Sequence, residues 1–293
     1  MTNIHYAEHE ISSGSARIVL SVWEPLKPDA VILFIPGTMV HPLFYELLLI
    51  GFARRGFAVI GLHPVGHGKS PRDVTRYTIR DIVQNARDAV SFALQKYDLP
   101  IMVMGSSQGG IVAAALASED ARITAAFAHN VMLAELPDSI GISRFPGWLR
   151  HVYRPMQGLF AFFARIFPDL ALPAGFYLEH ARISTDLKIW EALKNDPLCL
   201  SRYSLCFLSS LFTTRFPGLT DGSMNCSLYV LTDSGDRLFT QSYTEQVFER
   251  LKAPHKEMIT FHFNDHLLMV TYPQEVCDRL TEIIQKEIGV QML

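Results

Sequence analysis

Residues 101–117, IMVMGSSQGGIVAAALA, contain the pattern on which the fold depends. The apolar run at 101–104 is typical of a buried strand, and the small side chains of 111–117 are typical of a closely packed helix. Between them lies Gly105-Ser106-Ser107-Gln108-Gly109, a G-x-S-x-G pentapeptide. In a strand–turn–helix context this pentapeptide predicts a nucleophile elbow, a strained turn that exposes the central serine hydroxyl. An ordinary glycine-rich connection is the alternative.

Strand and helix patterns alternate along most of the chain. The apolar runs after residue 30 are continuous rather than alternating, as expected for parallel strands that are buried on both faces. The first two runs adjoin directly, which predicts an antiparallel hairpin at one edge. The sequence therefore predicts an α/β fold that is doubly wound, with a mostly parallel eight-stranded sheet. Strands are expected near 4–9, 15–23, 30–35, 57–62, 101–105, 123–129, 226–232 and 257–263, and helices near 41–55, 78–97, 107–118, 240–252 and 273–287.

The alternation stops between about residues 134 and 219. This stretch is rich in aromatic and aliphatic side chains, contains several prolines and shows no obvious strand. An all-helical insertion followed by a return to alternation predicts a lid after the sixth strand. We therefore expect three parts of the chain: a first core part at 1–133, the helical lid (cap) at 134–220, and a second core part at 221–293.

Two later loops carry the groups that a serine nucleophile needs. A base must accept the hydroxyl proton, and a carboxylate must orient the base. Asp236 follows the strand pattern CSLYVLTD, and His266 follows EMITFHF. Both lie at the carboxyl ends of expected parallel strands, where ligand crevices form in open α/β sheets. Serine, then aspartate, then histidine is the hydrolase order rather than either protease order.

Other titratable residues near these loops are expected to have different roles. Asp233 is interpreted as an edge-of-strand or turn residue, although it lies close to Asp236 in sequence. Asp138 follows the preceding strand and is an alternative position for the acid. Asp265 is expected to brace its loop or face water, and His262 is expected to be structural because it alternates with phenylalanines.

Two further segments complete a family pattern. Residues 34–70, FIPGTMVHPLFYELLLIGFARRGFAVIGLHPVGHGKS, resemble the α/β-hydrolase block from the oxyanion loop to the Gly-His-Gly loop. Residues 195–198, NDPL, resemble the branch of monoacylglycerol lipases, lysophospholipases and serine aminopeptidases. The resemblance covers nearly the full chain. It implies a serine nucleophile, a histidine base, an acid and two backbone N–H donors of an oxyanion hole, which are Ser107, His266, Asp236, Thr38 and Gln108.

The chain departs from the family pattern at two positions. The oxyanion loop usually starts His-Gly, and here it starts Pro36-Gly37, so the contacts by which that histidine braces the loop are lost. His63 stands where an aspartate usually precedes the Gly-His-Gly loop. His63 and His67 lie four residues apart on a loop that contains proline and glycine, and structural roles are favoured over a metal site. We expect neither a metal nor an organic cofactor.

Residues 148–167, WLRHVYRPMQGLFAFFARIF, have apolar side chains at helical spacing, with an interruption near Pro155. These residues form either lid helices that pack on the core or the roof of an acyl-chain tunnel. The arginines between them face water or an anionic lipid surface. The apolar stripe consists of Leu149, Val152, Tyr153, Met156, Phe160, Phe163 and Phe167, the arginines are Arg150, Arg154 and Arg165, and the residues expected to line a substrate pocket are Met39, His129, Phe160 and Phe163.

Composition excludes some classes of protein. The 293 residues are 49% hydrophobic and carry a net charge of −3, which supplies a large core but no basic excess for nucleic acid. No apolar run approaches the roughly 20 residues that span a bilayer, and we recognise no signal peptide. The four cysteines show no metal or redox spacing, which predicts free thiols and a cytoplasmic location.

The expected activity is hydrolysis of the carboxylic ester of a hydrophobic acyl substrate, a small molecule or a lipid, through an acyl-enzyme on Ser107. Contact with membranes is expected to be transient, at the lid surface. A peptidase, thioesterase, lactonase or carbon–carbon hydrolase with the same triad is the alternative, and so is a non-catalytic or slow ligand sensor. An aminopeptidase would need acidic lid residues for the substrate ammonium group. Glu179, Asp186 and Glu191 are available, although they resemble surface charges.

Overall fold

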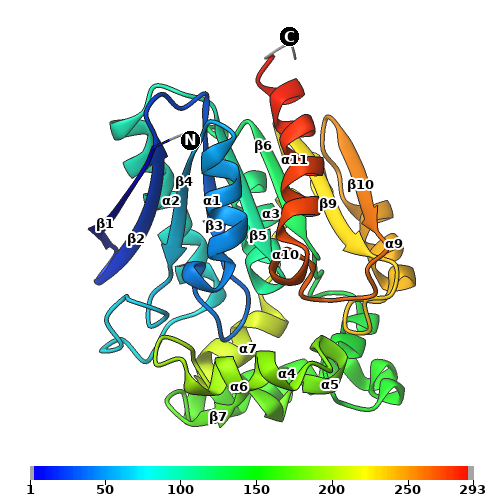
Figure 1. Cartoon of the computed structure of the whole chain (residues 1–293). Coiled ribbons are helices and arrows are strands. Elements are labelled where there is room, and N and C mark those ends of the chain that lie inside the picture. Colours follow the sequence, from blue (N-terminus) through cyan, green and yellow to red (C-terminus); the bar gives the residue numbers. More distant parts are fainter. Residues whose placement is uncertain (1–2, 290–293) are drawn as a thin grey trace.

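The fold is built on one eight-stranded, mostly parallel sheet (Figure 1). The computed structural model describes residues 3–289. The strand order is β1-β2-β4-β3-β5-β6-β9-β10, and β2 pairs antiparallel with β1 and β4, whereas the other neighbours are parallel. The predicted sheet and its edge hairpin are confirmed. The bounds are β1 (Ile4–Ser13), β2 (Ala16–Pro25), β3 (Ala30–Ile35), β4 (Phe57–His63), β5 (Ile101–Ser106), β6 (Ala125–His129), β9 (Ser227–Asp233) and β10 (Lys256–Phe261).

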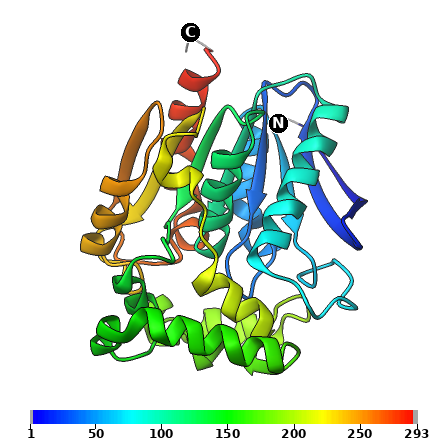
Figure 2. The ribbon, with the colours of Figure 1, turned by 180° about the vertical axis from the view of Figure 1, so that it is seen from behind.

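Helices cover both faces of the sheet. Two helices pack on the face seen in Figure 1, and three pack on the face seen in Figure 2. Strands β3 to β6 are buried along their whole length, which explains why their sequences are continuously apolar. The face seen in Figure 1 carries α1 (Glu46–Arg54), which follows the 3₁₀ turn η1 (Pro42–Tyr45), and α11 (Pro273–Glu287), which follows α10 (Leu268–Thr271). The face seen in Figure 2 carries α2 (Ile79–Lys96), α3 (Gln108–Glu119) and α9 (Gln241–Arg250).

The segment between β6 and β9 forms a layer across the carboxyl ends of the strands (Figure 1). The prediction that this segment is all-helical is wrong, because two three-residue strands, β7 (Ala171–Pro173) and β8 (Arg202–Ser204), pair antiparallel within it. Strands this short leave no alternation in the sequence. The remaining elements are η2 (Pro137–Ile142), η3 (Gly147–Val152), α4 (Tyr153–Ile166), η4 (Ala174–Phe176), α5 (His180–Ile183), α6 (Leu187–Asn195), α7 (Leu205–Thr213) and α8 (Gly218–Asp221).

Helix α4 runs without a break, so the predicted interruption near Pro155 is wrong. Pro155 lies in the first turn of α4, where a missing N–H removes no intrahelical hydrogen bond. Only part of the predicted apolar stripe faces inward. Tyr153 is buried, whereas Phe163 and Phe167 are 45% and 53% exposed. Within residues 3–289, no helix is long and apolar enough to cross a membrane.

Candidate active site

Ser107 lies on a strained turn between β5 and α3. Its φ of 54° and ψ of −117° are outside the regions that non-glycine residues normally adopt. The two flanking glycines make this turn possible, because a Cβ on Gly105 would collide with the carbonyl oxygen of Gly109, and a Cβ on Gly109 would collide with that of Ile35. The turn therefore has the geometry that the pentapeptide predicts for a nucleophile elbow.

The loops after β9 and β10 bring an aspartate and a histidine to this turn. The Nε2 atom of His266 lies 3.1 Å from Oγ of Ser107. The Nδ1 atom of His266 lies 2.8 Å from Oδ2 of Asp236. Both the histidine and the aspartate are 4% exposed. The three residues predicted from distant parts of the sequence thus form one hydrogen-bonded chain.

Asp236 is held as a carboxylate by the groups around it. Its Oδ1 accepts the backbone N–H groups of Leu238 and Phe239 at 2.7 and 3.0 Å, and its Oδ2 accepts Nδ2–H of Asn130 at 3.2 Å. Burial by itself raises the pKa of this carboxyl group, but the neighbouring His266 imidazole and these hydrogen bonds lower the pKa below its ordinary value. The charge that would stabilise a His266 imidazolium is therefore in place.

His129 does not lie where a substrate-lining residue was expected. Its side chain is fully buried behind the predicted triad, with its ring centroid 5.5 Å from that of His266. Its Nδ1 lies 3.3 Å from Oγ of Ser106, and its Nε2 lies 3.0 Å from Nδ2 of Asn130. Burial lowers the pKa of His129 to about 3. The low pKa means that His129 supports the site as a neutral ring. The side chain is buried because His129 is the last residue of the central strand β6 and points into the core.

The two backbone N–H groups predicted to form an oxyanion hole, those of Thr38 and Gln108, belong to residues that line one cavity with Ser107. In the part of the chain that the structure describes, neither the N–H of Thr38 nor that of Gln108 donates to a protein acceptor. The side chains of these residues join the two sides of the hole, since Oγ1 of Thr38 donates to Oε1 of Gln108 at 3.0 Å. The N–H of Gly37 donates to Oη of Tyr45 at 3.3 Å. Tyr45 thus makes one contact on a loop that lacks the usual histidine.

The side chains of the other titratable residues considered from the sequence have bonding partners outside the predicted triad. Asp233 is buried and accepts the N–H groups of Gly235 and Phe263 at 2.9 and 2.7 Å, so it ties together the two loops that carry the acid and the base. Asp138 is on the surface beside Arg150, at 3.8 Å. Asp265 accepts the N–H of Leu267, so it braces its own loop as expected. His262 is hydrogen-bonded to Ser234 on the surface, which agrees with the structural role expected for it.

Two small cavities adjoin Ser107. One, of about 40 Å³, lies between Met39 and His266, so Met39 lines the site as predicted. The other, of about 20 Å³, extends from Ser107 to Tyr177 and Phe212 in the insertion. The rings of Tyr177 and Phe212 meet edge to face, with centroids 5.9 Å apart.

Tyr177 and Phe212 also line a third cavity, of about 290 Å³, which lies beneath α4. We call it the apolar chamber, because nearly all of its lining side chains are aliphatic or aromatic. Phe160, Phe163 and Met156 line it. Contact of Phe160 and Phe163 with a substrate stays a prediction. Sequence reasoning did not identify Tyr177 and Phe212, because neither belongs to a motif and their pairing depends on how α7 packs.

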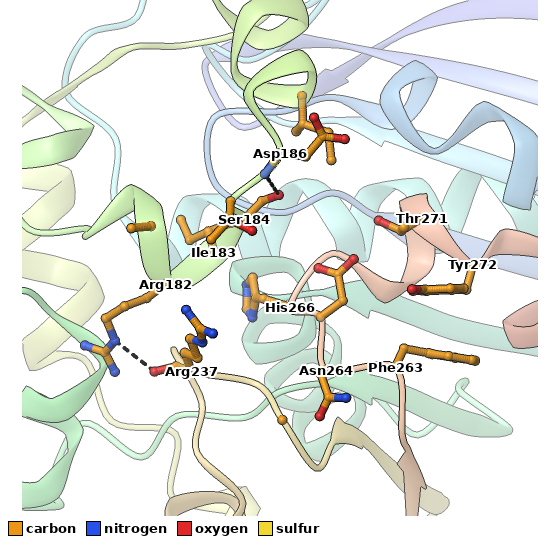
Figure 3. Close-up of a pocket in the computed structure, with 15 residues that line it drawn as sticks. Arg182, Ile183, Ser184, Asp186, Arg237, Phe263, Asn264, His266, Thr271 and Tyr272 are labelled. Carbon is orange, nitrogen blue, oxygen red and sulfur yellow. Dashed lines mark hydrogen bonds between the residues drawn. The ribbon is translucent and has the colours of Figure 1, made fainter.

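A fourth cavity, of about 210 Å³, lies on the other side of His266 and is polar (Figure 3). We call it the polar vestibule. Arg182 lies at its wall, but its guanidinium donates to backbone carbonyls, one of which is that of Arg237 at 2.8 Å. Figure 3 shows the side chain of Arg237 in the space beside His266. Within residues 3–289, this side chain makes no hydrogen bond or ion pair, and Asp186 and Asp265 also line the vestibule.

Among residues 3–289, two groups of side chains have the types and spacing of metal ligands. One consists of His129, Asp236 and His266, which are all buried and in which Nδ1 of His266 and Oδ2 of Asp236 are hydrogen-bonded to each other at 2.8 Å. The other consists of His41, Asp196 and Cys199, in which Nε2 of His41 and Oδ2 of Asp196 are likewise hydrogen-bonded at 2.8 Å. His63 and His67 belong to neither group. Both are buried and hydrogen-bonded around their own loop.

The whole fold is similar to solved structures of lipases and esterases. A monoacylglycerol lipase from Paleococcus ferrophilus is 18% identical, with 99% of this chain and 100% of that chain covered at a TM-score of 0.72. A soluble variant of monoglyceride lipase from Saccharomyces cerevisiae, solved in complex with a substrate analog, is 14% identical, with 98% and 96% covered at 0.76. A carboxyl esterase from Bacillus coagulans in complex with glycerol is 16% identical, with 98% and 100% covered at 0.70. No curated protein matches the chain.

A family model described as serine aminopeptidase, S33, matches residues 26–270. This range contains the elbow, the oxyanion loop, the insertion and the loops that carry Asp236 and His266. The similarity to solved structures at 14–18% identity shows the fold. The chain is therefore an α/β-hydrolase that belongs to the serine aminopeptidase S33 family.

Proposed function

We propose that this hydrolase cleaves a carboxylic ester of a hydrophobic acyl substrate through an acyl-enzyme on Ser107. The observation that carries the proposal is the chain of contacts Ser107–His266–Asp236 at 3.1 and 2.8 Å, beside two N–H groups for which residues 3–289 provide no acceptor. A ligand sensor needs neither a strained serine nor an oriented base, so this combination favours catalysis over the sensor alternative.

The reaction has two acyl-transfer steps. Ser107 Oγ–H donates to Nε2 of His266, which takes the proton as Oγ attacks the ester carbonyl carbon. The carbonyl oxygen becomes an oxyanion that accepts the N–H groups of Thr38 and Gln108, while Asp236 stabilises the imidazolium. His266 then gives its proton to the leaving alcohol. Water then loses a proton to the same nitrogen as its oxygen attacks the acyl carbon, and His266 returns this proton to Oγ of Ser107 as the bond from Oγ to the acyl carbon breaks and the acid leaves.

The cavities on the Gln108 side support a hydrophobic acyl group. The apolar chamber, at about 290 Å³, is just below the usual range of small-molecule sites and presents almost no polar group to a ligand. Tyr177 and Phe212 stand between the chamber and the cavity at Ser107. An acyl chain that passes these two rings buries its methylenes in the chamber, at about 0.8 kcal/mol for each CH₂.

The polar vestibule supports a hydrophilic leaving group. It shares His266 with the cavity at Ser107, and His266 is the residue that must protonate the leaving alcohol. Its hydrogen-bonding groups include Arg237, Asp186 and Asp265, which can satisfy hydroxyl or charged groups on the alcohol (Figure 3). The best-fitting substrate is therefore amphipathic, with its acyl chain in the chamber and its polar alcohol in the vestibule.

A chain-length series of p-nitrophenyl esters, from acetate to palmitate, tests the proposal on the wild type and on Ser107→Ala. We expect turnover that depends on Ser107 and peaks at medium or long chains. Turnover by Ser107→Ala within tenfold of the wild type would exclude Ser107 as the nucleophile. Turnover confined to acetate would contradict the acyl chamber and reopen the peptide, thioester, lactone and carbon–carbon alternatives.

Aminopeptidase activity is the second candidate, because Asp186 and Asp265 line the polar vestibule next to His266. Their carboxylates suit a substrate ammonium group, whereas Glu179 and Glu191 line none of the cavities described above. The cationic side chain of Arg237 in the same vestibule opposes this reading. Amino-acyl p-nitroanilides compared with p-nitrophenyl esters separate the two candidates.

We also infer transient contact between the insertion and an anionic lipid surface. Large apolar side chains of the segment 148–170 are exposed, and three arginines lie among them. Co-sedimentation with vesicles that contain anionic lipid, compared with neutral vesicles, measures this contact. The exposed side chains are Trp148, Val152, Leu159, Phe162, Phe163, Ile166, Phe167 and Leu170, and the arginines are Arg150, Arg154 and Arg165. A cytoplasmic location stays a prediction from the sequence.

A further inference from the structure

The loop that carries Thr38 is bonded to the insertion. Met39, the next residue, has a φ of 73°, a conformation that side-chain-bearing residues rarely adopt. Its N–H donates to Oη of Tyr203 at 2.6 Å, and its carbonyl oxygen accepts the N–H of Leu200 at 2.8 Å. Both backbone polar groups of Met39 are thus bonded to residues that come just before and within β8.

A second contact ties the same loop to the same part of the insertion. Nε2 of His41 lies 2.8 Å from Oδ2 of Asp196, and the His41 side chain is almost completely buried. The carboxylate is itself fixed, because Oδ1 of Asp196 accepts the N–H of Leu198 at 2.8 Å. Burial raises the pKa of Asp196, but the contact with His41 and the hydrogen bond from the N–H of Leu198 together outweigh burial, so the pKa lies below its ordinary value.

The contacts made by Tyr203 and Asp196 brace the oxyanion loop in place of the histidine that it lacks. With Pro36 at its start, the oxyanion loop lacks the histidine that usually braces it. The loop also makes hydrogen bonds from the N–H of Gly37 to Oη of Tyr45 at 3.3 Å and from Oγ1 of Thr38 to Oε1 of Gln108 at 3.0 Å. The N–H of Thr38 is separated by one Cα from the peptide group that Tyr203 holds. Rotation of that peptide group would release the strained φ of Met39 and remove a constraint on the position of Thr38, whose N–H belongs to the preceding peptide group.

We propose that Tyr203 and Asp196 are positioning residues of the oxyanion hole, so that the segment 196–203 of the insertion is part of the catalytic machinery rather than a cover over it. This inference rests on the proposed function. It also constrains substrate entry, because an insertion that lifted away as one body would break the contacts to Met39 and His41. Substrate must enter while the segment 196–203 stays in place.

Tyr203→Phe tests the inference with the least disturbance. The substitution removes only the hydroxyl and keeps a buried ring that stacks on Phe207 with centroids 5.0 Å apart. Removal of a whole oxyanion donor typically costs about 10²–10³ in kcat. A donor that loses its orientation costs less, and we expect kcat to fall by about tenfold with KM within about twofold. For Asp196→Asn, which keeps the size of the side chain, we expect a fall of about threefold to tenfold.

A transition-state analogue distinguishes positioning from general structural support. An alkyl trifluoromethyl ketone adds to Ser107 and forms an oxyanion, so its Ki should rise in both variants by the same factor as kcat/KM falls. The matched control is Tyr97→Phe, which removes the hydroxyl of another buried tyrosine, located after α2 and remote from the oxyanion loop. It should leave kcat, KM and Ki unchanged.

The outcomes separate this inference from the proposed function. If both variants keep kcat and Ki within twofold of the wild type at an unchanged Tm, the inference is wrong. A loss of activity through KM alone, or without a change in Ki, also overturns it. If Tyr203→Phe does not fold, Asp196→Asn decides, because the Asp196 side chain is 29% exposed and its loss leaves the core intact. If instead Ser107→Ala is as active as the wild type, the proposed function itself fails.

Discussion

Asp236→Asn changes one carboxylate oxygen of the predicted triad to an NH₂ group, and the structure determines which one. Oδ1 accepts the N–H groups of Leu238 and Phe239, so the amide oxygen must take that position to avoid placing donor against donor. The NH₂ group then faces Nδ1 of His266. It donates to Nδ1, which keeps the ring proton on Nε2. A protonated Nε2 is unable to accept the proton of Ser107.

The loss of the negative charge adds to this effect. A carboxylate about 4 Å from an imidazolium contributes about 4 kcal/mol at an effective dielectric constant of about 20. Because about 1.4 kcal/mol corresponds to a factor of ten in rate, the charge alone accounts for about 10³ in kcat. The analogous substitution in a serine protease, where the tautomer is also wrong, costs about 10⁴. We therefore expect kcat of Asp236→Asn to be lower by about 10³–10⁴.

The assay is the initial rate of p-nitrophenyl butyrate hydrolysis at pH 8, with the Tm of each variant measured to establish that it is folded. Asp138→Asn is the control, because Asp138 is the alternative acid from the sequence and lies on the surface near Arg150. Its kcat should stay within twofold of the wild type. The reasoning is refuted if Asp236→Asn keeps more than a tenth of the wild-type kcat, or if Asp138→Asn is the variant that loses activity.

Three other predictions concern the chamber, the loops and acid stability. Met156→Trp fills part of the apolar chamber. If the larger side chain excludes about two methylenes of the acyl chain, at about 0.8 kcal/mol each, kcat/KM for long esters falls about 15-fold. The kcat/KM for the acetate ester should not change. Asp233→Asn loses one of two backbone hydrogen bonds, so the free energy of unfolding by urea should fall by about 1–3 kcal/mol, with a far smaller loss of kcat than in Asp236→Asn. Burial lowers the pKa of three histidines from 6.5 to about 3, 4 and 3. The unfolded chain therefore binds more protons than the folded one as the pH falls. The free energy of unfolding contributed by these neutral rings is fully present above pH 6.5 and is lost as the pH falls below it. Each should lower the free energy of unfolding by about 1.4 kcal/mol between pH 7.5 and 5.5, and a urea midpoint that does not fall would contradict these shifts. The three are His63, His67 and His129.

The features that the sequence alone established are those that depend on neighbours along the chain. The elbow is readable because the close approach of backbone at Gly105 and Gly109 requires glycine, and both lie within a few residues of Ser107. The central strands β3 to β6 are readable because strands buried on both faces are continuously apolar. Asp236 and His266 could be placed near Ser107 because the carboxyl ends of parallel strands share one edge of a sheet.

Tertiary structure decided the features that depend on contacts between distant segments. Whether the last residue of β6, His129, faces the pocket or the core is set by packing, and the structure buries it. The pairing of Tyr177 with Phe212 depends on how the insertion folds over the sheet. The same is true of α4, whose apolar stripe is split between the chamber and the surface.

The oxyanion loop shows the difference most clearly. The sequence located Thr38 and showed that Pro36 removes the usual brace, because both facts are local. It gave no indication that Tyr203, far along the chain, bonds the backbone of Met39. A hydrogen bond between a side chain and a remote backbone N–H leaves no periodicity or spacing in the sequence, and only the folded chain brings the two groups together.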